Sequence, residues 1–208
     1  MTYSQRAIYA PRRTRIRRLR IAVLLVVLGA IWVALGNQVL GSSPSPVAAP
    51  VHVPRSEHRD ALGEAGGAVP HGTTVFDRGV PGVARLDPAL LGALRRAATD
   101  GGVELVVDSG WRSPAYQAQL LREAVSKYGS YQEAARWVAT PNTSAHVSGD
   151  AVDIASSGAA WLSAHGAAYG LCRIYGNEPW HFELRPDAIA HGCPPSYADP
   201  THDPRMQR

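Results

Sequence analysis

A long apolar segment near the N-terminus is the feature that most limits how this chain can fold. Residues 21–41 read IAVLLVVLGAIWVALGNQVLG. The strongly apolar part, residues 21–35, would be about 22 Å long as a helix, and extension through Leu40 gives roughly the 20 residues that cross a bilayer. We therefore expect a transmembrane signal anchor or a signal peptide cleaved within residues 36–49. No clear Ala-x-Ala site follows closely, which favours the anchor.

Arginines precede this segment and set its orientation. Residues 1–20 carry seven arginines, and no acidic residue occurs before residue 42. This basic tail would remain cytoplasmic while everything downstream is exported, and such a flank excludes a buried core helix. The net charge is +4, yet residues 42–208 hold 14 of the 21 basic residues and all 17 acidic ones, a net of −3. The charge therefore argues against a broad phosphate-binding surface on the body of the protein, and we expect no nucleic-acid partner.

The remaining chain divides by composition. Residues 42–69 begin as a stretch rich in Ser, Pro and Ala, which predicts an extended linker off the membrane. Residues 70–200 are long enough for one domain with its own core, and residues 201–208 are assigned to a tail. Cys172 and Cys193 are a disulfide candidate in an exported chain, with two unpaired buried thiols as the alternative.

Local patterns predict an α+β fold with a small sheet. Asp87 before Pro88 is typical of a helix start, and Gly101-Gly102 of its end. A helix after Ser113 is expected to bury an apolar face of Leu120, Leu121 and Val125. The other predicted elements are helices after Ser130 and over 159–170, and strands over 103–107, 150–155, 173–176 and 181–184.

Unusual residues gather in three short segments. In residues 141–155, His146 precedes a glycine turn, and Asp153 lies between two β-branched residues on a strand. Such a carboxylate is costly to bury unless it is paired or binds a metal, and taken alone it could equally be half exposed or salt-bridged.

The second segment, residues 176–184, places Glu178 three residues before His181. Glu183 falls on the same strand face as His181 and is expected to support it. A histidine beside Trp180 could equally be a packed core residue. In the third segment, residues 108–114, Arg112 could stabilise an oxyanion, hold a substrate carboxylate, or lie on the surface.

Together these segments favour a catalytic zinc-binding site. Two histidines and one aspartate form a three-ligand set that leaves a fourth position open for water, which is the catalytic arrangement. A nearby glutamate could then act as the general base for that water.

Three motifs resemble those of a known family. SAHVSGDAVD (144–153) resembles the S-x-H-x-x-G-x-A-x-D motif of the M15 zinc peptidases, EPWH (178–181) their E-x-W-H motif, and SGWRS (109–113) their S-G-[YW]-R-S segment. The chain is most similar to the VanY-like D-alanyl-D-alanine carboxypeptidases over roughly residues 70–190. The resemblance implies an antiparallel sheet lining a zinc cleft. It assigns zinc ligation to His146, Asp153 and His181, the general base to Glu178, the oxyanion contact to Arg112 and a substrate contact to Ser144.

The function implied by the resemblance is hydrolysis of the terminal D-Ala-D-Ala bond of peptidoglycan stem peptides outside the cytoplasmic membrane. A D,D-dipeptidase, an L,D-carboxypeptidase and a cell-wall endopeptidase of the same fold remain alternatives. A wall-binding module that keeps zinc without turnover is another. Glu178 argues against the binding module, since a binder needs no base.

Overall fold

A computed structural model describes residues 62–207. The basic tail (1–20), the transmembrane or signal helix (21–41) and most of the linker (42–69) were predicted for residues outside that range. Within it, the helices all fall short of the length and apolar character that a membrane span requires. The helical segments (α, and η for 3-10 turns) are η1 (Glu64–Gly66), α3 (Pro81–Ala84), α4 (Pro88–Gly101), α5 (Pro114–Tyr128), α6 (Tyr131–Ala135), α7 (Ala145–Ser148), α8 (Ser156–His165), η2 (Gly166–Tyr169), α9 (Ala188–His191), η3 (Pro200–His202) and η4 (Pro204–Gln207).

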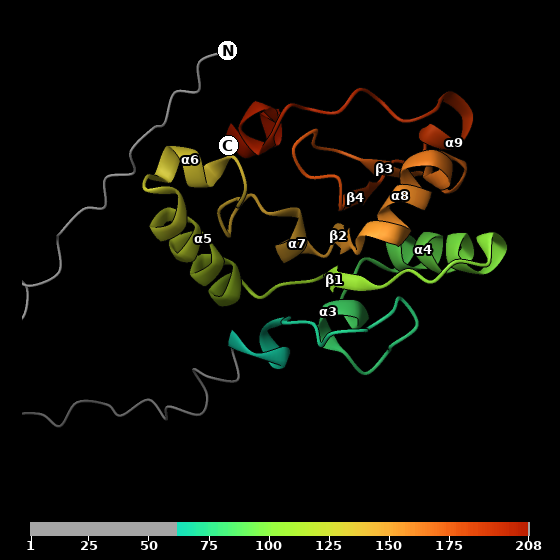
Figure 1. Cartoon of the computed structure of the whole chain (residues 1–208), viewed down its shortest axis with the longest axis horizontal. Helices are drawn as coiled ribbons and strands as arrows, with labels where there is room; N and C mark the ends of the chain where they lie inside the picture. The colour runs from blue at the N-terminus through green and yellow to red at the C-terminus, as the bar shows by residue number, and fades with distance from the viewer. Residues whose placement is uncertain (1–61, 208) are drawn as a thin grey trace, which may run out of the picture. The chain divides into compact units, whose positions relative to one another are not determined.

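One four-stranded sheet organises these elements. Its strands are β1 (Val107–Ser109), β2 (Ala151–Ile154), β3 (Leu171–Arg173) and β4 (His181–Leu184), in the order β1-β2-β4-β3. Every neighbouring pair is antiparallel. Figure 1 shows α5 and α6 together on one side of the sheet, and α4 and α8 on the other. The predicted α+β class with a small antiparallel sheet and flanking helices is confirmed.

The central strand β2 is covered on both faces. Val152 and Ile154 lie in the main hydrophobic core with Phe182 of β4 and the α4 side chains Leu90 and Leu94. The alternating residues Ala151 and Asp153 point the other way but are buried too. One face of the sheet therefore anchors the fold, while the opposite face carries the polar residues of the candidate site.

Helix α4 begins and ends as predicted. The Asp87 side chain accepts hydrogen bonds from the backbone N–H groups of Ala89 and Leu90, at 2.9 and 3.0 Å. At the other end Gly102 has a φ of 59°, the left-handed conformation that glycine adopts without strain. These two caps fix the length of the helix on which the sheet packs.

Two predicted strands are displaced. The apolar run 103–107 was predicted as a strand, but β1 begins only at Val107, because the run turns to pair with an earlier segment. The Thr74–Val106 bridge and the hydrogen bond from Val75 N to Leu105 O (3.2 Å) show this pairing. The strand predicted over 173–176 lies instead over Leu171–Arg173. Apolar, β-branched composition thus indicated burial correctly but not the strand limits.

Helix α5 buries a different face from the one predicted. Gln117 and Ala124 are buried, whereas Leu120, Leu121 and Val125 are only half buried. Leu120 lines a cleft, so this side of the helix is a wall of that cleft rather than part of the core.

The fold extends beyond both predicted domain limits. Residues 64–66, assigned to the linker, form turn η1, and Gly66 O accepts a hydrogen bond of 2.8 Å from Ser113 N. A Cβ on Gly67 would lie 2.2 Å from Trp111 O, so the chain passes too close there for a side chain. Residues 201–207, assigned to a tail, include the fully buried Asp203.

The predicted disulfide is present in the structure. Cys172 of β3 and Cys193 are bonded, with their Cα atoms 5.6 Å apart and a sequence separation of 21. In the chain-entropy model, a loop of this length stabilises the fold by about 3 kcal/mol. The bond ties the segment after α9 to the edge of the sheet.

Candidate active site

Strand pairing brings two of the predicted ligands face to face. Asp153 of β2 and His181 of β4 are direct partners across the antiparallel ladder. His181 Nδ1 lies 3.2 Å from Asp153 Oδ1. These residues are 28 positions apart in sequence, and the sheet register alone places them together.

The third predicted ligand comes from the short helix α7. His146 is buried, and its Nε2 atom lies 3.5 Å from the same oxygen, Asp153 Oδ1. The helix ends at Gly149, whose φ is 84° and where a Cβ would meet Arg85 O at 2.6 Å. Only glycine fits there, and the turn that it makes leads from His146 straight into β2.

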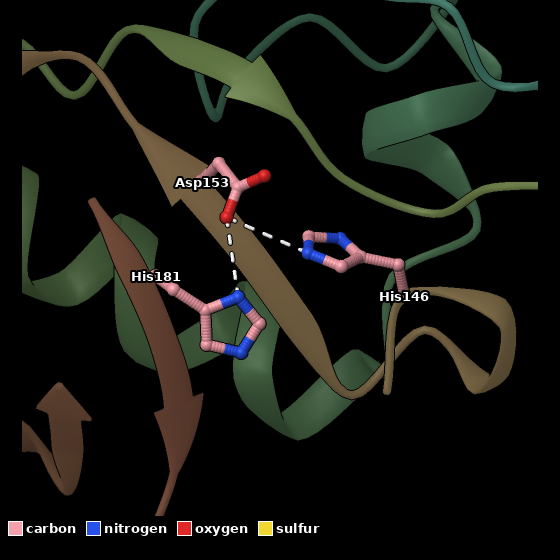
Figure 2. A group of neighbouring side chains, drawn as sticks. All are labelled: His146, Asp153 and His181. Carbon is pink, nitrogen blue, oxygen red and sulfur yellow. Dashed lines mark hydrogen bonds and ion pairs between the residues drawn. The ribbon is translucent and has the colours of Figure 1, made fainter. Parts of the chain in front are cut away.

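Each histidine makes a hydrogen bond through its other ring nitrogen, and this bond determines which nitrogen could bind a metal ion. His146 Nδ1 lies 2.8 Å from the carbonyl oxygen of Gly110, which can only accept a hydrogen bond, so Nδ1 carries the hydrogen and Nε2 presents a lone pair. His181 Nε2 lies 3.3 Å from the Glu183 carboxylate, so Nδ1 is the nitrogen of that ring that faces Asp153 and the ligand cluster. Figure 2 shows both nitrogens directed at one carboxylate oxygen.

These donors fit a metal ion. Among the described residues, His146, Asp153 and His181 form a buried group whose ligand atoms lie within 4.8 Å of one another. Two imidazoles and one carboxylate are a donor set that suits zinc. Burial lowers the pKa of His146, which keeps that ring neutral as a ligand must be.

Neighbouring side chains favour the charged forms of the other two donors, Asp153 and His181. Burial alone would raise the pKa of Asp153, but His146, His181 and Arg112 hold it well below its usual range. Burial also opposes protonation of His181, yet hydrogen bonds to Asp153 and Glu183 raise its pKa to about 9. A metal ion bound at His181 Nδ1 would replace the proton on that nitrogen, so metal binding would release a proton.

Arg112 is neither a surface residue nor free. Its guanidinium donates to Asp153 Oδ2 at 2.8 Å, to Gln117 Oε1 at 3.1 Å and to Ser109 Oγ at 2.8 Å. The salt bridge considered for Asp153 therefore exists, but on the oxygen that points away from the histidines. Arg112 holds one carboxylate oxygen and leaves the other to face the ligand cluster.

Glu178 lies beside the cluster on the loop before β4. Its side chain is buried, Oε2 is 3.7 Å from His181 Nδ1, and Oε1 has no hydrogen-bond partner among residues 62–207. Burial raises the pKa of Glu178 to about 7. A carboxyl group poised in this way can accept or donate a proton near neutral pH.

A cleft opens onto these residues. Its volume is about 320 Å³, and its lining includes all three ligand residues, Glu178, Arg112 and the buried Ser144. Trp180, the neighbour of His181 in sequence, is 38% exposed on the cleft wall. The Tyr175 ring packs on His181 instead, with the ring centroids 5.1 Å apart.

All six predicted site residues thus lie at one cleft. The expected contact between Glu183 and His181 is also present. The motifs gave no indication of Gln117 or Tyr175, nor of Arg205, which binds Glu183 from the C-terminal end of the chain. Gly110 lies within the SGWRS motif, but nothing in that motif indicated that its carbonyl oxygen would contact His146. Three donors that leave one side open, next to a buried carboxyl group, are the arrangement that zinc peptidases use.

Comparison with known proteins agrees with that class. Residues 88–187 match the family model "VanY: D-alanyl-D-alanine carboxypeptidase". A curated D-alanyl-D-alanine carboxypeptidase from Enterococcus faecalis is 32% identical, over 47% of this chain and 46% of that protein. Residues 88–187 therefore form a domain of the VanY type, the D-alanyl-D-alanine carboxypeptidases. The chain spans about half the length of the curated relative.

Two solved structures are also similar. A vancomycin-resistance D,D-pentapeptidase VanY from a VanB-type resistance cassette, in complex with Zn(II), is 30% identical over 48% of this chain and 72% of that chain, with a TM-score of 0.43. VanYB in complex with D-alanine-D-alanine is 29% identical over 51% of this chain and 74% of that chain, with a TM-score of 0.45.

Proposed function

We propose that this protein is a zinc D,D-carboxypeptidase that removes the terminal D-Ala from peptidoglycan stem peptides. The observation that carries the proposal is the buried Oε1 atom of Glu178, which is unpartnered within the described part of the chain. Burying a carboxylate oxygen without a hydrogen bond costs free energy of folding, so such an oxygen in a cleft indicates a role in function rather than in stability. An attacking water beside the ligand cluster would satisfy it.

Metal binding and proton transfer would be carried out by different residues of the site. His146, Asp153 and His181 would hold a zinc ion, which when bound lowers the pKa of a coordinated water to about 7 and polarises the substrate carbonyl. Glu178 would accept the proton of the attacking water and pass it to the leaving amine of D-Ala. The pKa of about 7 that burial gives Glu178 suits a group that both takes and gives a proton.

Arg112 and Ser144 would contact the substrate. Arg112 places a fixed positive charge in the cleft wall, where it would stabilise negative charge developing on the scissile carbonyl oxygen. Its bonds to Gln117 and Ser109 restrain the guanidinium, so little reorganisation is needed. Ser144 lies at the start of α7, two residues before His146, and could orient the peptide.

The substrate class rests on the family and on the size of the cleft. The family is named for action on D-alanyl-D-alanine, and VanYB was solved with that dipeptide. A cleft of about 320 Å³ is at the small end of ligand pockets, which suits the end of a peptide rather than a long segment.

We further propose that the domain acts outside the cytoplasmic membrane, held there by a helix over residues 21–41. The apolar segment after seven arginines supports that orientation. The Cys172–Cys193 disulfide supports it independently, because such bonds persist in oxidising compartments.

An assay of the zinc-loaded full chain against tripeptide, tetrapeptide and pentapeptide stems, with products identified by mass spectrometry, tests this function. We expect the pentapeptide alone to lose one D-Ala and to leave the tetrapeptide. A chelator should abolish the reaction, and added zinc should restore it.

Other products would point to the alternatives. Release of a D-Ala-D-Ala dipeptide would indicate a D,D-dipeptidase, and conversion of tetrapeptide to tripeptide an L,D-carboxypeptidase. Cleavage confined to cross-linked stems would indicate an endopeptidase. Bound zinc without hydrolysis of any stem would mean that the domain binds the wall without turnover.

A further inference from the structure

The C-terminal end of the chain folds back onto the candidate site. Residues 197–207, here called the C-terminal clasp, lie after the part that matches the VanY family model. Tyr197 N donates to Ile174 O at 2.9 Å, Gly176 N to Tyr197 O at 2.8 Å and Asn177 N to Ala198 O at 3.2 Å. The start of the clasp therefore runs beside the segment that leads to Glu178.

Arg205 anchors the far end of the clasp at Glu183. Its Nη1 atom donates to Glu183 Oε2 at 2.7 Å, and Nη2 donates to Oε1 at 3.1 Å. This two-pronged geometry sets the orientation of the carboxylate as well as its position. Glu183 itself is 1% exposed, so the acidic partner of the ion pair lies out of water, while the Arg205 side chain is 38% exposed.

A second acid holds Arg205 in turn. Arg205 Nε lies 3.0 and 3.1 Å from the two carboxylate oxygens of Asp203, which is fully buried. The same carboxylate accepts a 3.0 Å hydrogen bond from the Tyr175 hydroxyl, and the Tyr175 ring packs on His181. The clasp thus reaches His181 by two routes, through Glu183 and through the Tyr175 ring.

The contact that matters for chemistry is the one from Glu183 to His181. Glu183 Oε1 lies 3.3 Å from His181 Nε2, so it accepts the hydrogen of that nitrogen and turns Nδ1 toward Asp153 and His146. Without Arg205, the Glu183 carboxylate would keep, among the described residues, only Arg185 and His181 itself as ionic partners.

We propose that the C-terminal clasp is a positioning device for the metal ligand His181, acting through the chain Asp203–Arg205–Glu183. This inference rests on the proposed zinc site. Arg205 is a positioning residue: it touches neither substrate nor metal, but it fixes the carboxylate that fixes the imidazole. Pro200 and Met206 of the same segment line the cleft, so the clasp also forms part of its wall.

Zinc affinity of the full chain, measured by competition with a chromogenic chelator, tests the proposal. We expect Arg205→Met to bind zinc about 10- to 100-fold more weakly than the wild type, as is usual when a hydrogen-bond partner of a metal ligand is disturbed. Glu183→Gln keeps an acceptor for His181 but loses the ion pair, and we expect a similar loss. The double variant should lose no more than either single variant, because both break one chain of contacts.

Arg136→Met is the matched control. Arg136 Nε holds the clasp at Asp199, at 3.0 Å, without touching Glu183. If the clasp acts through Glu183, this variant should keep its zinc affinity within about 2-fold. The melting temperature of each zinc-free variant reports any general loss of folding, and Glu183→Gln, nearly equal in shape, stands in if Arg205→Met does not fold.

The outcomes separate this inference from the proposed function. Unchanged zinc affinity in folded Arg205→Met or Glu183→Gln, with a normal wild type, would overturn the clasp alone. Equal losses in Arg136→Met and Arg205→Met would also overturn it, since the clasp would then matter only for stability. A wild-type chain that binds no zinc would overturn both proposals.

Discussion

Glu178→Gln is expected to bind zinc as tightly as the wild type while its kcat falls by about 10²- to 10⁴-fold, the usual contribution of a general acid–base group. The amide has the shape of the carboxyl group but cannot take a proton from water. Because Oε1 of Glu178 has no partner within residues 62–207, the substitution breaks no hydrogen bond of that oxygen. Fold and metal binding should therefore survive the loss of turnover.

Glu104→Gln is the control for this variant, since Glu104 is an exposed glutamate away from the cleft. It should keep both zinc and activity. Zinc content by mass spectrometry and D-Ala release, measured on the same samples, separate the two properties. If Glu178→Gln turned over stem peptides at the wild-type rate, Glu178 would not be the base.

Asp153→Ala is expected to weaken zinc binding by more than about 100-fold, and turnover should be lost with the metal. Disturbing a partner of a ligand usually costs 10- to 100-fold in affinity, so removing a direct ligand should cost more. Asp153 Oδ1 is also the one atom that both histidines face, at 3.5 and 3.2 Å. Its loss removes the centre of the cluster.

The same change should lower stability even without zinc. Arg112 would lose its carboxylate partner in a site where both side chains are only 12–13% exposed. Breaking such a pair costs about 3 kcal/mol, at the low end of the usual range because Gln117 and Ser109 still bind the guanidinium. Asp108→Ala, at an exposed position of β1, should change neither property. Stoichiometric zinc in Asp153→Ala would contradict the ligand assignment.

The site residues that could be predicted from the sequence are those that lie within short motifs. His146 and Asp153 are separated by one glycine turn and half a strand, and Glu178 and His181 by three positions, so local spacing already limits where they can lie. The helix limits at Asp87 and Gly102 could be predicted for the same reason, since a cap depends on its immediate neighbours.

The partners that orient those residues could not be predicted. Arg205 meets Glu183 across 22 positions and Gly110 meets His146 across 36, and neither contact depends on a local pattern. A backbone carbonyl such as that of Gly110 leaves no trace in residue type. Residues 201–208, which lie outside the motifs, were assigned to a tail, yet Arg205 among them pairs with the buried Glu183 carboxylate.

X-ray absorption at the zinc edge of the zinc-loaded chain tests the central claim most directly. The account predicts one zinc per chain with two imidazole nitrogens, one carboxylate oxygen and a fourth light-atom ligand at about 2.0–2.2 Å. That fourth ligand should persist in Glu178→Gln, because it is water rather than Glu178. Failure to bind stoichiometric zinc, or loss of the fourth ligand in Glu178→Gln, would contradict an open catalytic site at His146, Asp153 and His181.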